Sequence, residues 1–165
     1  MNLLKTLALT AALLTGVTAA HAQVAVKHIQ TDKSPIATGV WAGDTYYLSG
    51  QLANPLHPIA PADMSKATLA DYGDTKTQAA SVFAKIKAAL QEQGLDMKDV
   101  VKLTVFLAPD PVTGKLDFAG MQSQYLKYFG TPDQPNKPAR SAFQVAALAA
   151  PWAMLEIEAI AVRSK

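Results

Sequence analysis

Residues 75–107 read TKTQAASVFAKIKAALQEQGLDMKDVVKLTVFL and place a helix directly before a strand. Thr75 and Gln78 fit a capping box at the start of the helix, and Gly94 supplies its stop. The apolar residues between them recur at helical spacing as one stripe of Ala79, Val82, Phe83, Ile86 and Leu90. Residues 100–107 then alternate as a strand does. Its predicted apolar face is Val101, Leu103, Val105 and Leu107, opposite Lys102 and Thr104.

The flanking sequence predicts further strands and one more helix. Residues 24–30 alternate, and Gly43-Asp44 is typical of a turn between strands at 39–41 and 45–49. Asp117 can cap a second helix, whose predicted buried stripe is Phe118, Met121, Tyr125, Tyr128 and Phe129. Residues 141–147 and 154–162 return to strand patterns. The order β-β-β-α-β-α-β-β predicts an α+β fold with a mixed sheet and two helices packed on one face. Oligomerisation would be a natural cover for the other face.

Two features interrupt the regular pattern. Gly50 follows a strand at a point where a side chain is expected to clash. Residues 51–73 hold three prolines and lose all periodicity, which predicts an unusually long loop. Long loops in compact domains often lie beside a functional site, although a plain insertion would look the same.

The composition of the chain excludes several classes of protein and of site. The chain has 165 residues, is 50% hydrophobic and 17% charged, and so fits one folded domain and excludes disorder as its main state. A net charge of +2 without a Lys/Arg run disfavours nucleic-acid binding. The absence of cysteine excludes cysteine nucleophiles, zinc ribbons and iron–sulfur clusters. His28 and His57 alone cannot build a histidine-rich metal site, so we expect no such site in the chain.

Residues 1–22 have the pattern of a signal peptide. Lys5 supplies a positive charge, residues 7–20 are apolar and uncharged, and Ala20-His21-Ala22 offers a cleavage site before Gln23. The apolar stretch is short and rich in small residues, which disfavours a membrane anchor. We therefore expect a single domain at 23–165, exported to the periplasm or secreted, with no membrane association after cleavage.

Two sets of charged residues stand in apolar strands. Arg140 opens one such strand, and its planar guanidinium could bind a carboxylate, although an ion pair or solvent could equally account for it. Glu156 and Glu158 share one face of a strand about 7 Å apart and need solvent or cations, for which Lys102 is a plausible cross-strand partner. A glycosidase pair is disfavoured because nothing else in the chain builds a sugar cleft.

Four motifs occur in order along the chain: Ser49-Gly50-Gln51, residues 99–107 (DVVKLTVFL), residues 138–141 (PARS) and residues 156–161 (EIEAIA). Together they resemble the RidA/YjgF family of reactive-intermediate deaminases, over a span from about Ile29 to Arg163. The resemblance implies a fold similar to the chorismate mutase of the bacillus type, assembled as a homotrimer with a barrel-like centre and clefts between subunits. It also implies cofactor-free hydrolysis of enamines and imines, such as 2-aminoacrylate, to 2-keto acids and ammonia.

The resemblance assigns roles to three residues. Arg140 matches the carboxylate-binding arginine, Glu156 the glutamate that positions or activates water, and Ser49 a serine of the cleft. Two pocket positions depart from the archetype, where Ile36 replaces a tyrosine and Ala142 a cysteine.

Other departures lie beside these positions. Gln122 replaces an asparagine, and the loops at 52–73 and 110–115 are longer than usual. These changes keep the carboxylate clamp and alter the pocket wall, which leaves the substrate range open.

We expect a hydrolytic deaminase of small 2-imino and enamino acids, with a small carboxylate as substrate. The alternative is a non-catalytic binder of small carboxylates, or a chaperone-like protein, of the same fold. Ribonuclease activity, attributed to some family members, is disfavoured because the chain offers neither a basic groove nor a suitable histidine pair.

Overall fold

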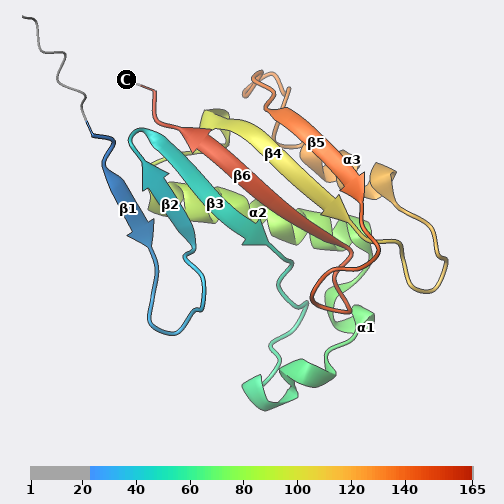
Figure 1. Cartoon of the computed structure of the whole chain (residues 1–165). Coiled ribbons are helices and arrows are strands. Elements are labelled where there is room, and N and C mark those ends of the chain that lie inside the picture. Colours follow the sequence, from blue (N-terminus) through green and yellow to red (C-terminus); the bar gives the residue numbers. More distant parts are fainter. Residues whose placement is uncertain (1–22, 165) are drawn as a thin grey trace, which may run out of the picture.

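The computed structural model describes residues 23–164, so the predicted signal peptide lies outside the described residues. One six-stranded sheet has the order β1-β2-β3-β6-β4-β5 (Figure 1). The strands are β1 (Val26–Ile29), β2 (Gly39–Ala42), β3 (Thr45–Gln51), β4 (Val100–Leu107), β5 (Ala139–Gln144) and β6 (Leu155–Val162). Strands β4 and β5 run parallel and all other neighbours antiparallel, which confirms the predicted mixed sheet.

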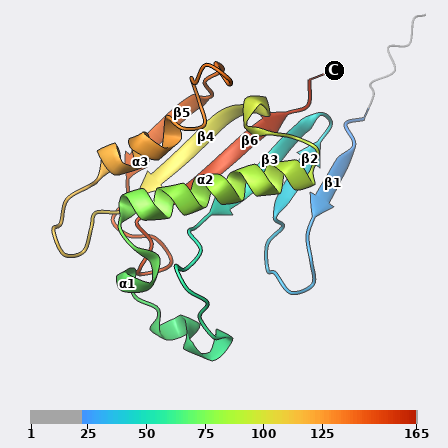
Figure 2. The same ribbon diagram turned by 180° about the vertical axis from the view of Figure 1, so that it is seen from behind.

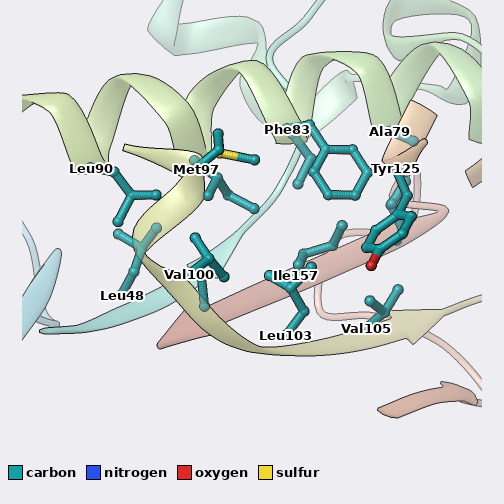
Figure 3. Close-up of a cluster of buried hydrophobic side chains, with 14 of the residues drawn as sticks. Leu48, Ala79, Phe83, Leu90, Met97, Val100, Leu103, Val105, Tyr125 and Ile157 are labelled. Carbon is teal, nitrogen blue, oxygen red and sulfur yellow. The ribbon is translucent and has the colours of Figure 1, made fainter. Parts of the chain in front are cut away.

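Helices α2 (Thr75–Glu92) and α3 (Phe118–Tyr125) cover one face of this sheet (Figure 2), as predicted. The whole predicted stripe of α2 is buried against the sheet. Figure 3 shows this layer, in which Phe83 and Leu90 of α2 point toward Leu103 and Ile157 of the central strands. Burial of such side chains contributes about 1.5–3 kcal/mol each, so this layer holds the fold together.

The start of α2 differs from the prediction. Asp74 is the N-cap and its carboxylate accepts a hydrogen bond from the Thr77 backbone N–H at 2.8 Å, so the capping box of Thr75 and Gln78 is wrong. A carboxylate one residue earlier takes the cap. Gln78 is fully buried instead and ties the helix start to the chain before β6, bonding the backbone of Trp152 and Met154 at 2.9 Å. The predicted Asp117 cap and the Gly94 stop are both confirmed.

Two apolar positions are also corrected. A register shift lies between Val100 and Lys102, so Val100 is buried and Val101 is 46% exposed, opposite to the predicted face. Such an irregularity turns one residue out of the alternation. Helix α3 ends at Tyr125, before Tyr128 and Phe129, and Phe118 is 41% exposed rather than buried.

The long loop between β3 and α2 contains structure of its own. It forms a 3-10 turn, η1 (Pro61–Lys66), and a one-turn helix, α1 (Leu69–Tyr72), which extend beyond the end of the sheet (Figure 1). A second 3-10 turn, η2 (Met97–Asp99), precedes β4. The buried Tyr72 ring stacks on Trp152 with 3.4 Å between centroids, which fastens the loop to the segment before β6.

The face of the sheet opposite α2 and α3 has no helix of the described chain over it (Figure 1). It carries polar and aromatic side chains, and a hollow of about 280 Å³ is lined by Tyr47, Ser49, Lys102, Thr104 and Glu158 among others. No helix within residues 23–164 has the length and apolar character needed to cross a membrane.

Candidate functional site

Arg140 lies at the edge of the sheet on the side of the helices. It is the second residue of β5, beside the buried Leu103 of β4. Its Nη1 donates a 2.8 Å hydrogen bond to Oε1 of Gln122 on α3. Its guanidinium carbon lies 4.4 Å from the ring centre of Tyr125 and 5.6 Å from that of Phe118. The cation is therefore held from two sides, and its remaining N–H donors can meet a carboxylate.

Helical spacing explains why these partners meet. Phe118, Gln122 and Tyr125 follow one another at i, i+4 and i+7, and so share one face of α3. Sequence reasoning assigned Phe118 and Tyr125 to packing alone and missed their contact with the arginine. Ala142 lies two residues after Arg140 on the same side of β5 and is exposed. We call Phe118, Gln122, Tyr125, Arg140 and Ala142 the arginine half-site.

Glu156 lies on the open face of the sheet. It alternates with the buried Leu155 and Ile157 of β6 and is itself half-buried. Its side chain lies against Gly50 of β3, where an added Cβ would collide with Oε1 and the carboxyl carbon. The predicted clash at Gly50 is confirmed, and its cause is this carboxylate. The register between β3 and β6 shifts between Leu48 and Gln51, at the same place.

Ser49 connects the glutamate to the loop before β2. Its hydroxyl donates to the Ala37 carbonyl at 2.8 Å, and its backbone N–H to that of Thr38 at 3.0 Å. Ile36, next to Ala37 in the chain, is 63% exposed. The structure thus brings together Ser49, Gly50 and Glu156 with the loop that carries Ile36. We call these four residues the glutamate half-site.

The two half-sites do not meet within one chain. Arg140 and Glu156 are on strands that flank β4, beside Leu103 and Phe106 respectively. That register separates them by roughly 10 Å along the strands and roughly 10 Å across them. Their side chains also leave opposite faces of the sheet, since Arg140 contacts α3 and Glu156 does not lie on the helix-covered face. One chain alone cannot place both groups on one small molecule.

Lys102 does not pair with either glutamate of β6. Its Nζ donates to the Ser141 hydroxyl at 2.9 Å, toward β5. The register explains this, because Lys102 lies beside Ile160 whereas Glu158 lies beside Thr104. Within residues 23–164 the salt bridge found is Lys66–Asp63, on the surface of η1. The predicted cross-strand pair is therefore wrong.

The described chain holds no obvious metal centre. Residues 23–164 contain no cluster of three or more His, Cys, Asp or Glu side chains that could hold an ion. His28 in β1 and His57 in the long loop are both exposed and stand apart from the two half-sites.

Comparison with known proteins identifies relatives of this chain. The family model described as endoribonuclease L-PSP matches residues 27–163. The RutC family protein of Haemophilus influenzae is 36% identical over 141 residues, covering 82% of this chain and 95% of its own length. A protein of Escherichia coli named "Putative reactive intermediate deaminase TdcF" is 34% identical over 143 residues, covering 84% and 98%.

Solved structures agree in fold. The crystal structure of Escherichia coli TdcF with bound serine has a TM-score of 0.61 at 32% identity, over 84% of this chain and 99% of that one. RidA from an Antarctic Psychrobacter species has a TM-score of 0.60 at 32% identity, over 83% and 99%.

Proposed function

Because this chain belongs to the RidA/YjgF family, we propose that it is a hydrolytic deaminase, which converts small 2-imino and enamino acids to 2-keto acids and ammonia. Relatives named as reactive intermediate deaminases support this class of reaction. The observation that carries the proposal is Arg140, a guanidinium fixed by Gln122 and Tyr125 with donors left for an anion. Every substrate of this class carries a carboxylate.

Arg140 would bind that carboxylate and orient the substrate. A planar fork of N–H donors matches a carboxylate with two parallel hydrogen bonds, which fixes both position and angle. Serine, bound in the Escherichia coli TdcF structure, is itself a small carboxylate. Gln122 would hold the guanidinium plane steady, since it accepts one N–H and leaves the others free.

We further propose that the cleft is completed between copies of the chain, as in the homotrimer that the family resemblance implies. The arginine half-site of one copy would then face the glutamate half-site of another. Two observations favour this arrangement. Arg140 and Glu156 occupy opposite faces of the sheet. The face that carries Glu156 also has no helix of its own chain over it (Figure 1).

Glu156 would transfer protons during hydrolysis of the C=N bond. A water oxygen would add to the C=N carbon while the carboxylate takes a proton from that water. Addition to the protonated imine would give a neutral carbinolamine, whose nitrogen would take that proton back and leave as ammonia while the hydroxyl proton passes to the carboxylate and the C=O of the keto acid forms. The reaction consumes one water and no oxidant. Ser49 would line the same cleft, its oxygen able to accept a hydrogen bond from the substrate nitrogen.

The test compares wild type with two variants of residues 23–165, the form that we propose remains after signal cleavage and export. An amino-acid oxidase would generate 2-imino acids in the presence of catalase, and semicarbazide would capture the imine that is not hydrolysed. We expect wild type to speed keto-acid release, Arg140→Ala to abolish the effect, and Glu156→Gln to lower it at least 100-fold.

The same variants separate the deaminase from the alternative, a non-catalytic carboxylate binder. In a deaminase, Glu156→Gln loses turnover but still binds a keto acid such as pyruvate in calorimetry, whereas Arg140→Ala loses both. If wild type binds pyruvate through Arg140 and accelerates no imine, the protein is a binder and the deaminase proposal is wrong.

A further inference from the structure

An exposed aromatic ring stands beside the carboxylate clamp. Phe118 is the first residue of α3 and is 41% exposed, although its ring lies 5.6 Å from the Arg140 guanidinium carbon. Tyr125 on the same helix face is buried, at 7% exposed, so the two rings play different parts. Tyr125 supports the cation, and Phe118 presents apolar surface next to it. Ala142, also exposed, lies two residues further along β5 and adds only a methyl group to this side of the strand.

The glutamate half-site also presents an apolar side chain. Ile36 is 63% exposed, yet its backbone is tied down, because the Ser34 hydroxyl donates to the Ile36 carbonyl at 2.7 Å. The adjacent Ala37 carbonyl accepts from Ser49. The loop thus holds Ile36 by its backbone and leaves the side chain free. An apolar group fixed in this way beside polar catalytic groups is typical of a binding-site wall.

The polar groups of both half-sites are partly engaged already. The Ser49 hydroxyl hydrogen is given to Ala37, and the Gln122 carbonyl accepts from Arg140. A hydroxyl or carboxylate on a substrate side chain would meet Ile36 and Phe118 instead. Burying such a group without a partner is unfavourable, whereas an apolar side chain gains by displacing water from both surfaces.

We propose that the substrates are 2-imino acids with apolar side chains of about leucine size or larger, selected by Ile36 and Phe118. The carboxylate would bind Arg140 and the side chain would lie between the two apolar residues when two copies form the cleft. This specificity rests on the proposed deaminase function. An apolar pocket distinguishes side chains by roughly 10- to 200-fold for each methylene at best, so a graded preference is expected.

The experiment measures a ratio within each protein sample. D-Amino-acid oxidase would supply the imines of leucine, phenylalanine, alanine and serine, and kcat/KM would be obtained for each. We expect the leucine imine to exceed the alanine imine at least 10-fold, and the serine imine to be no better than that of alanine. Phe118→Ala should lower the leucine-to-alanine ratio about 5- to 30-fold, and Ile36→Thr about 3- to 10-fold.

Val112→Ala is the matched control, because Val112 is 86% exposed in a turn outside both half-sites and its loss should leave the ratio unchanged. A ratio divides out any loss of folded protein, so a destabilised variant still gives an answer. If wild type hydrolyses all four imines equally, or if Phe118→Ala keeps the ratio, the specificity is wrong and the deaminase function stands. If wild type hydrolyses none of them, the deaminase function itself is wrong.

Discussion

The two half-sites are built by different means. Arg140 is fixed by side chains, through the hydrogen bond that it donates to Gln122 and its contacts with the rings of Tyr125 and Phe118. Glu156 is positioned by shape, because its carboxylate occupies the space that Gly50 leaves without a Cβ. Arg140 is thus held by attractive contacts with its neighbours, whereas Glu156, the residue proposed to activate water, is placed by steric fit. Substitutions in the two half-sites should therefore affect different kinetic constants.

Among variants that keep both Arg140 and Glu156, Gly50→Ala should have the largest effect. The new Cβ would collide with the Glu156 carboxylate, so the glutamate must leave its place. We expect kcat for imine hydrolysis to fall about 100-fold, while KM and pyruvate binding, which depend on Arg140, change little.

A double-mutant cycle tests whether the collision is the cause. Glu156→Asp alone should reduce kcat, yet it should add little loss in the Gly50→Ala background, because both changes act on one carboxylate. Independent, additive losses would show that Gly50 acts by another route.

Gln122→Ala should have a smaller effect on the opposite half-site. Arg140 would keep its charge and the Tyr125 ring but lose the acceptor at 2.8 Å. We expect KM to rise about 5- to 10-fold with kcat nearly unchanged, in line with a hydrogen bond to a charged group. Gln122→Asn, whose side chain is shorter by one methylene, should have a KM between those of wild type and Gln122→Ala. A fall in kcat at constant KM would contradict a positioning role for Gln122.

Asp74→Ala should have the smallest effect on chemistry and serves to separate stability from both half-sites. Losing this cap should lower the free energy of unfolding by about 1 kcal/mol at neutral pH, with imine kinetics unchanged. Hydrogen bonds from Thr77 hold the pKa of the Asp74 carboxyl below its usual range.

The pH dependence gives this prediction a sign. Because the Asp74 pKa is lower in the folded than in the unfolded chain, its contribution is present above about pH 4 and is lost as pH falls through the lowered value. The difference in unfolding free energy between wild type and Asp74→Ala should therefore shrink on acidification. Asp74→Asn keeps an uncharged cap, so the difference in unfolding free energy between Asp74→Asn and Asp74→Ala should not shrink on acidification. A gap that is constant from pH 7 to pH 3 would contradict it.

Local patterns predicted the fold better than they predicted the site. The stripe of α2 and the alternation of β6 depend on spacing alone, so the sequence was enough for both. Alternation alone assigns Val101 to the wrong face, because the register shift between Val100 and Lys102 arises only when β4 pairs with β6. The spacing of Phe118 matches the buried stripe and so predicts a core residue, whereas at the first position of α3 its side chain is 41% exposed.

The candidate residues themselves were predicted, but their separation was not. Which face a side chain leaves depends on the strand order and on the parallel pairing of β4 with β5, and neither can be read from alternation within one strand. The sequence therefore indicated Arg140 and Glu156 as partners without showing that one chain keeps them apart.

The opposite placement of Arg140 and Glu156 has a genetic consequence. If clefts are completed between copies as proposed, a chain that lacks Arg140 still offers an intact Glu156 to its neighbour. Two inactive alleles, one damaged in each half, could then restore some working clefts when expressed together, whereas two alleles damaged in the same half could not. Loss of function would then follow the rules of intragenic complementation, because the active unit is the cleft formed by two chains and not the single polypeptide.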